Sequence, residues 1–170
     1  MRQAIVWARL FGVSGAVVEA VELDESLGTA VARVRVRRGQ SRRCGVCGRR
    51  CSVYDRGEGR RQWRTLDPGT TMAFVETDAP RVSCPRHGVV VARVPWARHD
   101  SRFTKYFEEQ CAWLAVHVSK TTLAELVRIA WRTVGRIIGR VVEERSAEVD
   151  RLDGLRKIGI DEVSFRRGQR

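Results

Sequence analysis

The sequence lacks any uninterrupted run of about 18 apolar residues, and this argues against a membrane-spanning helix. Arg9 interrupts the apolar part of residues 1–18, which also lack a clear cleavage site, so we predict no signal peptide. We therefore expect a cytoplasmic protein, in which thiols stay reduced. The five cysteines, an odd count, then favour metal binding over disulfide bonds.

Lysine is scarce, because only three of the 32 basic residues are Lys, and 20 acidic residues leave a net charge of +12. Arginine stays charged and pairs with phosphate through two hydrogen bonds. The excess is local, since residues 31–64 carry twelve arginines against one Asp and one Glu. Such a block predicts double-stranded DNA as the partner, with a merely soluble basic protein as the alternative.

Residues 32–37 alternate between a small apolar residue and arginine, which predicts a half-buried strand. Its outer face would present Arg33, Arg35 and Arg37 to DNA phosphates. Charge on an edge strand also prevents aggregation, so solubility is the other interpretation.

Two pairs of potential metal ligands share one spacing, with two residues between the members of each pair. Cys44 and Cys47 form the first pair, and Cys84 and His87 form the second. A tetrahedral set of three thiolates and one imidazole suits a structural zinc ion. Short β-like runs between the pairs indicate a zinc-ribbon-like arrangement. Buried thiols without an ion, or Cys51 in place of one ligand, are the alternatives.

Beyond Trp96 the apolar residues recur every three or four positions, which predicts helices. The first would run from about 103 to 118 with Ser101 as its N-cap. A short second helix would begin with a capping box of Thr122 and Glu125, and a third would begin at Trp131. This order predicts a helix-turn-helix, with a plain three-helix bundle as the alternative.

In the helix-turn-helix interpretation, the third helix enters the major groove with its solvent-facing side. That side would carry Arg132, Thr133, Arg136 and Arg140. Residues at the start of the preceding helix would hold a phosphate; they are Lys120, Thr121 and Thr122. We expect Cys111 and the rings of Trp113 and Trp131 to lie in the core, with base stacking as the alternative for the two rings.

These parts, in this order, resemble the ISL-three family of bacterial insertion-sequence transposases over about residues 40–170. The motifs that carry the resemblance are Cys44-Gly-Val-Cys47, Cys84-Pro-Arg-His87-Gly88, Val94-Pro95-Trp96-Ala97, Ser119-Lys120-Thr121-Thr122, Trp131-Arg132-Thr133-Val134 and Gly159-Ile160-Asp161-Glu162. The resemblance implies an RNase-H-like domain with three catalytic carboxylates, of which Asp161 matches the first. The full-length domain would use Mg(II), but the other two carboxylates would lie beyond Arg170, so we expect the chain alone to be inactive.

The expected fold is α+β, with a small β-rich zinc-ribbon-like domain, a helix-turn-helix domain and the first strand of a truncated RNase-H-like domain. The expected segments are 1–39 (N-terminal, with the basic strand), 40–100 (zinc-binding), 101–150 (helix-turn-helix) and 151–170 (catalytic start). The expected function is recognition of the terminal inverted repeats of an insertion sequence, with a homodimer on the DNA ends as one option. The alternatives are a regulator that competes with the full-length transposase, an enzyme completed by another chain, and a protein-interaction module.

Overall fold

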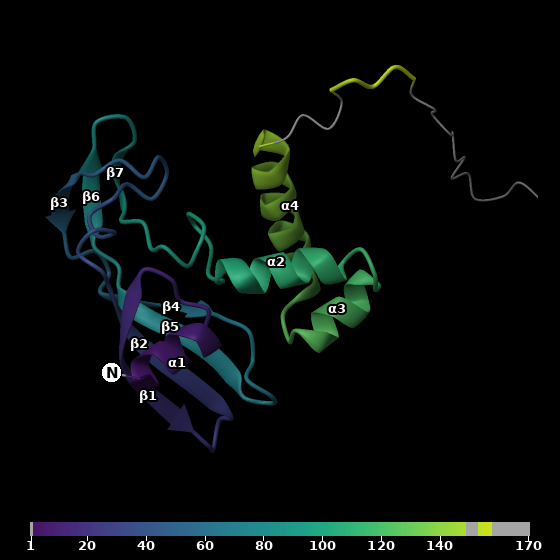
Figure 1. The fold of residues 1–170 in the computed structure, drawn as a ribbon, viewed down its shortest axis with the longest axis horizontal. Coiled ribbons are helices and arrows are strands. Elements are labelled where there is room, and N and C mark those ends of the chain that lie inside the picture. Colours follow the sequence, from purple (N-terminus) through teal and green to yellow (C-terminus); the bar gives the residue numbers. More distant parts are fainter. Residues whose placement is uncertain (1, 149–152, 158–170) are drawn as a thin grey trace, which may run out of the picture.

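The computed structural model of the chain describes residues 2–148 and 153–157 (Figure 1). Two sheets occupy one side of the molecule and three helices the other. The elements are, in chain order, α1 (Arg2–Leu10), β1 (Ala16–Asp24), β2 (Thr29–Val36), β3 (Ser52–Asp55), β4 (Arg60–Arg64), β5 (Met72–Asp78), β6 (Arg81–Cys84), β7 (Gly88–Val91), α2 (Lys105–Leu114), α3 (Lys120–Leu126) and α4 (Trp131–Glu148).

The larger sheet has the strand order β1-β2-β5-β4. β1 and β2 form an antiparallel hairpin, β2 pairs in parallel with β5, and β4 pairs antiparallel with β5. The strand predicted from alternation at 32–37 is confirmed as part of β2, where Ala32 and Val34 are buried. β4 and β5 follow Cys44 and Cys47, the first pair of ligands, in the chain. The domain boundary expected at residue 39 therefore cuts through this sheet.

The core of the larger sheet gathers residues from distant parts of the sequence. Phe11, which follows α1, packs with Val34 of β2 and Val75 of β5. The rings of Trp63 and Trp96 meet edge to face with their centroids 5.9 Å apart, and each is almost fully buried. Trp96 thereby anchors the segment that leads from the smaller sheet to the helices.

The smaller sheet has the order β3-β6-β7 with antiparallel pairing throughout. The β-like runs expected between the two ligand pairs are confirmed as β3, β4, β5 and β6, but β4 and β5 belong to the larger sheet. The sequence did not predict β7, which pairs with β6 across the turn that holds His87. The zinc-ribbon-like unit is therefore formed by β3, which lies between β2 and β4 in the chain, and by the hairpin β6–β7, which follows β5.

The caps of α2 and α3 differ from those predicted. Thr104, and not Ser101, caps α2, because its hydroxyl accepts a hydrogen bond from the N–H of Phe107. Ser101 instead accepts a hydrogen bond from the N–H of Phe103 in the preceding turn. Ser119 caps α3 by accepting from the N–H of Thr122, so the predicted capping box at Thr122 is wrong.

The helical core is built from the apolar faces of all three helices. Phe107 and Cys111 of α2 pack with Ile137 of α4, and Leu123 of α3 packs with Val134 of α4. Cys111 is buried as predicted, and this burial raises the pKa of its thiol to about 12. A short turn at 127–130 separates α3 from α4, in the order of a helix-turn-helix.

Candidate nucleic-acid interface and metal centre

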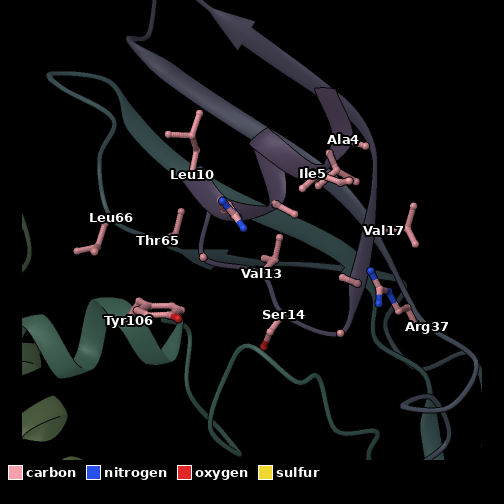
Figure 2. Close-up of a pocket in the computed structure, with 16 residues that line it drawn as sticks. Ala4, Ile5, Leu10, Val13, Ser14, Val17, Arg37, Thr65, Leu66 and Tyr106 are labelled. Carbon is pink, nitrogen blue, oxygen red and sulfur yellow. The ribbon is translucent and has the colours of Figure 1, made fainter. Parts of the chain in front are cut away.

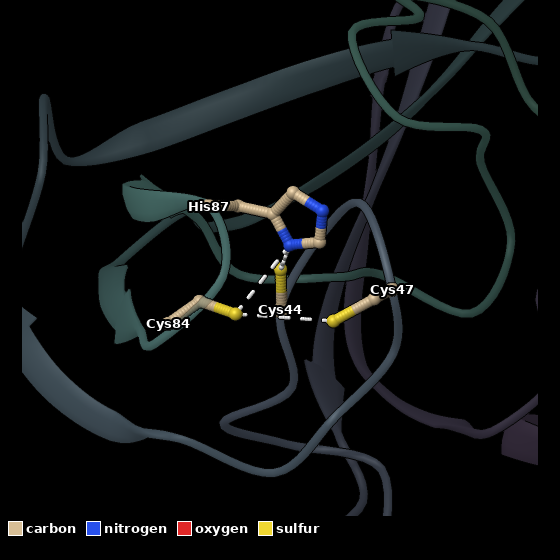
Figure 3. Close-up of side chains that lie close together, drawn as sticks. All are labelled: Cys44, Cys47, Cys84 and His87. Atoms are coloured by element: carbon tan, nitrogen blue, oxygen red, sulfur yellow. Dashed lines mark hydrogen bonds between the residues drawn. The ribbon is translucent and has the colours of Figure 1, made fainter.

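Four potential metal ligands converge at one end of the smaller sheet (Figure 3). Cys44 and Cys47 lie in the turn before β3, whereas Cys84 ends β6 and His87 lies in the turn before β7. The Sγ atoms of Cys47 and Cys84 are 3.8 Å apart. The Nδ1 atom of His87 lies 3.6 Å from the Sγ of Cys44 and 3.5 Å from the Sγ of Cys84. All four ligand atoms lie within 4.8 Å of one another.

These separations fit zinc. Zn–S bonds of about 2.3 Å and Zn–N bonds of about 2.0–2.1 Å place the ligands of a tetrahedral ion about 3.5–3.8 Å apart. Three thiolates with one imidazole are also a donor set that zinc favours. The cluster of Cys44, Cys47, Cys84 and His87 thus supports a structural zinc ion, because four protein ligands leave no open coordination position.

Two glycines allow the turn that holds Cys44 and Cys47 to lie against the rest of the chain. A Cβ atom at Gly45 would lie 2.5 Å from Nδ1 of His99 and 2.6 Å from the carbonyl oxygen of Val91. Gly48 closes the turn with a positive φ of 70° and donates its N–H to the carbonyl of Cys44 at 2.9 Å. The metal centre is therefore packed directly against the segment that leads to the helices.

The thiols of the cluster differ in their ionisation. The backbone N–H of Arg86 is the main reason why the pKa of Cys84 falls to about 6, so this ligand is a thiolate at neutral pH. Burial raises the pKa of Cys44. Cys51 lies outside the four-residue cluster, and its thiol donates to the carbonyl of Arg49 at 3.3 Å. The cluster therefore favours His87 over Cys51 as the fourth ligand.

The exposed face of α4 carries two of the predicted DNA-binding arginines. Val134, Ile137 and Val141 bury the opposite face, whereas Arg132 and Arg136 are exposed. Thr133 is half-buried, and its hydroxyl accepts a hydrogen bond from Arg136 at 3.4 Å. Arg132 and Arg136 are thus free of the helical core and accessible to a ligand.

Arg140 was predicted to lie on the same solvent-facing side, and this placement is wrong. Its Nε and Nη2 atoms donate to Oε1 of Glu108 at 2.9 and 2.5 Å. Arg140 lies one helical turn after Arg136 and at the edge of the same face, from which its guanidinium group reaches across to α2. Glu108 is fully buried, so Arg140 serves as its counter-ion.

The start of α3 lies beside the start of α4. Thr121 and Thr122 are exposed, as contact with a phosphate would require. The Nζ atom of Lys120 lies 3.3 Å from the centroid of the Trp131 ring. Trp131 and Trp113 are 54% and 59% exposed, so the prediction that both rings lie in the core is wrong.

Comparison with known proteins assigns both modules. Residues 92–142 match the helix-turn-helix domain of transposase family ISL3, and residues 40–87 match the zinc-finger of transposase IS204/IS1001/IS1096/IS1165. This chain therefore carries the helix-turn-helix and zinc-finger domains of ISL3-type transposases. The result confirms the resemblance to the ISL-three family that the motifs indicated.

Two relatives, from Mycobacterium tuberculosis strains CDC 1551 / Oshkosh and ATCC 25618 / H37Rv, are each named transposase for insertion sequence element IS1557. Each is 50% identical to this chain over an alignment of 175 positions that includes all of the chain. The chain spans 39% of the length of these relatives. No solved structure matches the chain significantly.

The ISL3 helix-turn-helix is joined to the larger sheet by hydrogen bonds of main chain and side chain. The N–H of Arg64 donates to the carbonyl of Arg102 at 2.8 Å, and the N–H of Thr104 donates to the carbonyl of Arg64 at 2.9 Å. Asp67, in the loop after β4, accepts hydrogen bonds from Arg64 and from Arg128 in the turn before α4. This link was not predicted from the sequence.

Glu108 is a second connection that the sequence analysis missed. Its carboxylate accepts hydrogen bonds from Arg98 at 3.0 Å and from the hydroxyl of Ser101 at 2.8 Å, in addition to those from Arg140. The signal was present, because position 108 falls on the same helical face as the buried Phe107 and Cys111. A carboxylate on an apolar face requires cationic partners.

The basic strand β2 has its charges partly neutralised within the sheet. Arg33 pairs with Glu22 at 2.8 Å and with Glu76 at 3.4 Å, and Arg35 pairs with a carboxylate of β1 at 2.9 Å. Arg37 follows β2 and is exposed. Phosphate contact by these three arginines stays a prediction.

Further exposed arginines flank the metal ligands of the ISL3 zinc finger in sequence. Within residues 2–148 no ion pair is found for them, so their charge is available to a polyanion. They are Arg42, Arg49, Arg50 and Arg86.

A groove of about 740 Å³ beside α1 has a different character (Figure 2). Its lining is mainly apolar and includes Ile5, Leu10 and Val13, with Tyr106 of α2 at one side. Most of this lining does not suit phosphate, although Arg37, one of the predicted DNA-binding arginines, also lines the groove.

Two remaining expectations concern Asp161 with its preceding strand and the absence of a membrane-spanning helix. Asp161 and the strand expected before it lie outside the described residues, apart from Lys157, which is exposed. Across the described part of the chain, every helix is too short or too polar to cross a bilayer.

Proposed function

We propose that this chain is the DNA-recognition part of an insertion-sequence transposase and binds the terminal inverted repeats of its own element. The observation that carries the proposal is the exposure of Arg132 and Arg136 on α4, the second helix of an ISL3 helix-turn-helix. Arginine at the N-terminal part of such a helix binds guanine edges with two hydrogen bonds.

The other basic groups would increase the affinity for DNA and fix the position of the chain on the duplex. The hydroxyls of Thr121 and Thr122, with Lys120, would hold a phosphate beside the start of α3, and the arginines of β2 and of the zinc finger would neutralise further phosphates. Arg140 contributes indirectly, since it stabilises the packing of α4 on α2 through Glu108.

The relatives named as transposases are more than twice as long as this chain. In a full-length protein of this kind, Asp161 would be the first of three carboxylates that hold Mg(II) for DNA strand transfer. Two chains would occupy the two ends of one element, which makes a homodimer on DNA a natural arrangement. These are proposals about the whole protein.

The test is a titration of the chain with the terminal repeat of its element and with a shuffled duplex of equal length. We expect tighter binding to the repeat, and an affinity that falls steeply with salt because bound phosphates release counterions. Arg136→Ala should lower the affinity for the repeat by about tenfold and leave the shuffled duplex little affected.

Arg9→Ala is the matched control, because it removes one exposed arginine from α1, away from the helix-turn-helix. It should alter the binding of both duplexes equally and weakly. Equal affinity for repeat and shuffled duplex would contradict recognition of the repeat, and an affinity independent of salt would contradict the role of the arginines.

A further inference from the structure

A tryptophan stands exposed at the first position of α4. More than half of the surface of Trp131 is accessible to solvent, although the sequence pattern placed it in the core. An indole ring offers a large apolar surface, and its exposure at the start of the recognition helix leaves that surface available to a ligand.

One face of the ring already has a partner. The ammonium group of Lys120 lies over it, 3.3 Å from its centroid, in a cation–π contact between α3 and α4. This contact holds the ring in one orientation, and it keeps the charge of Lys120 beside the start of α4.

The backbone one turn further along α4 is shaped around this pair. A Cβ atom at Gly135 would lie 2.8 Å from Nζ of Lys120, so any side chain there would displace the ammonium group. Glycine in a helix interior costs about 1 kcal/mol relative to alanine. Glycine at position 135 thus leaves the space in which the ammonium group of Lys120 lies over Trp131.

The pair adjoins the arginines that the proposed function assigns to base recognition. Trp131 precedes Arg132 in the first turn of α4, and Gly135 precedes Arg136 in the next. In the major groove, apolar side chains recognise thymine by contact with its 5-methyl group, and cationic side chains contact phosphate.

We propose that Trp131 determines sequence preference by packing its ring against the 5-methyl group of a thymine in the major groove. Lys120 fixes the ring and neutralises a neighbouring phosphate. This inference rests on the proposed function, since it requires that α4 enters the major groove.

The test uses a duplex selected by the wild-type chain from a randomised DNA library, and copies of it in which each thymine in turn is replaced by uracil. Uracil lacks only the 5-methyl group. At the contacted position the wild-type affinity should fall about fourfold, as expected for loss of one buried methyl group. Trp131→Ala should bind thymine and uracil duplexes equally at that position, and Trp131→Phe should keep part of the preference.

Trp113→Ala is the matched control, because Trp113 is exposed to a similar extent on α2 and packs on His117. It should retain the wild-type response to uracil at every position. Thermal unfolding of Trp131→Ala should match the wild type, because an exposed ring contributes little to the core.

Lys120→Gln provides a second, independent measurement. Indole fluorescence of the wild type should change on DNA binding, and this change should be absent from Trp131→Phe and reduced in Lys120→Gln. If the wild type binds DNA but Trp131→Ala keeps the full sensitivity to uracil, this inference is overturned while the proposed function stands. If the wild type binds no duplex, both are overturned.

Discussion

The carboxylate of Asp67, in the loop between β4 and β5, accepts a hydrogen bond from the guanidinium group of Arg128, in the turn between α3 and α4. Arg128 has a positive φ of 55°, and it also donates to the carbonyl of Thr70 at 3.0 Å. The tight turn of the helix-turn-helix is thereby attached to the sheet domain. Since that turn sets the angle between α3 and α4, the sheet helps to fix the recognition helix.

Asp67→Asn should lower the free energy of unfolding by about 2 kcal/mol, because it removes the charge that two guanidinium groups share. Arg128→Gln should have a smaller effect, since Arg64 keeps its bonds to Asp67. In urea denaturation, the double variant should be no less stable than Asp67→Asn alone. Strictly additive losses would show that Asp67 and Arg128 do not interact in solution.

The same link should depend on pH. Burial opposes ionisation of Asp67, but hydrogen bonds from Arg64 and Arg128 outweigh it and lower the pKa below the ordinary value of 3.8. A depressed pKa stabilises the fold above the unfolded value, and the stabilisation disappears as the pH falls through the folded value. Between pH 5 and 2, the wild type should therefore lose more stability than Asp67→Asn, measured by thermal unfolding.

Glu108→Gln tests the buried carboxylate that joins α2, α4 and the segment before α2. Glu108 is fully buried against Arg98 and Arg140, so its neutralisation leaves their charges without this partner. We expect a loss of about 3 kcal/mol in the free energy of unfolding. Glu109→Gln is the control, because the side chain of Glu109 is only partly buried and pairs with Arg98 at 3.3 Å. Its loss should stay below about 1 kcal/mol, and equal losses would count against a special role for Glu108.

Local patterns predicted much of the fold, because they depend on neighbouring residues. The alternation of apolar residues and arginine predicted β2, and the repeated spacing of the ligands predicted both halves of the metal centre. The parallel pairing of β2 with β5 could not be predicted from the sequence, because a parallel partner is determined by packing between distant segments. The predicted N-cap of α2 was wrong for a simpler reason. Ser101 and Thr104 both have a hydroxyl before the helix, and only packing decides which of them caps it.

The site was predicted less completely than the fold. The helical period placed Arg132 and Arg136 outside, because their neighbours at 134 and 137 are apolar. The same period placed Trp131 inside, but at the first residue of α4 the ring lies beyond the packed core and under Lys120. The placement of Arg140 was wrong because the sequence analysis overlooked that Glu108, its partner, lies on the buried face of α2.

Arg140→Ala and Arg136→Ala should separate fold stability from DNA recognition. Arg140→Ala removes a counter-ion of buried Glu108, so the free energy of unfolding should fall by about 2–3 kcal/mol. Arg136→Ala should leave stability within about 0.5 kcal/mol of the wild type, because its side chain is exposed. Urea denaturation of both variants measures this, and a larger loss for Arg136→Ala would reverse our assignment of the two side chains.

Zinc removal should unfold the smaller sheet while the helices persist, because the metal ligands join the turn before β3 to the hairpin β6–β7 and contribute nothing to the helical core. We expect one zinc ion per chain by elemental analysis, and its loss in Cys84→Ser. Cys51→Ser is the matched control and should keep the ion, since Cys51 lies outside the cluster. Affinity for zinc should also fall with decreasing pH because protons compete for the thiolates, and the fall should steepen below about pH 6, where Cys84 takes up a proton as well. Loss of zinc in Cys51→Ser with retention in a His87→Ala variant would assign the fourth ligand to Cys51 instead.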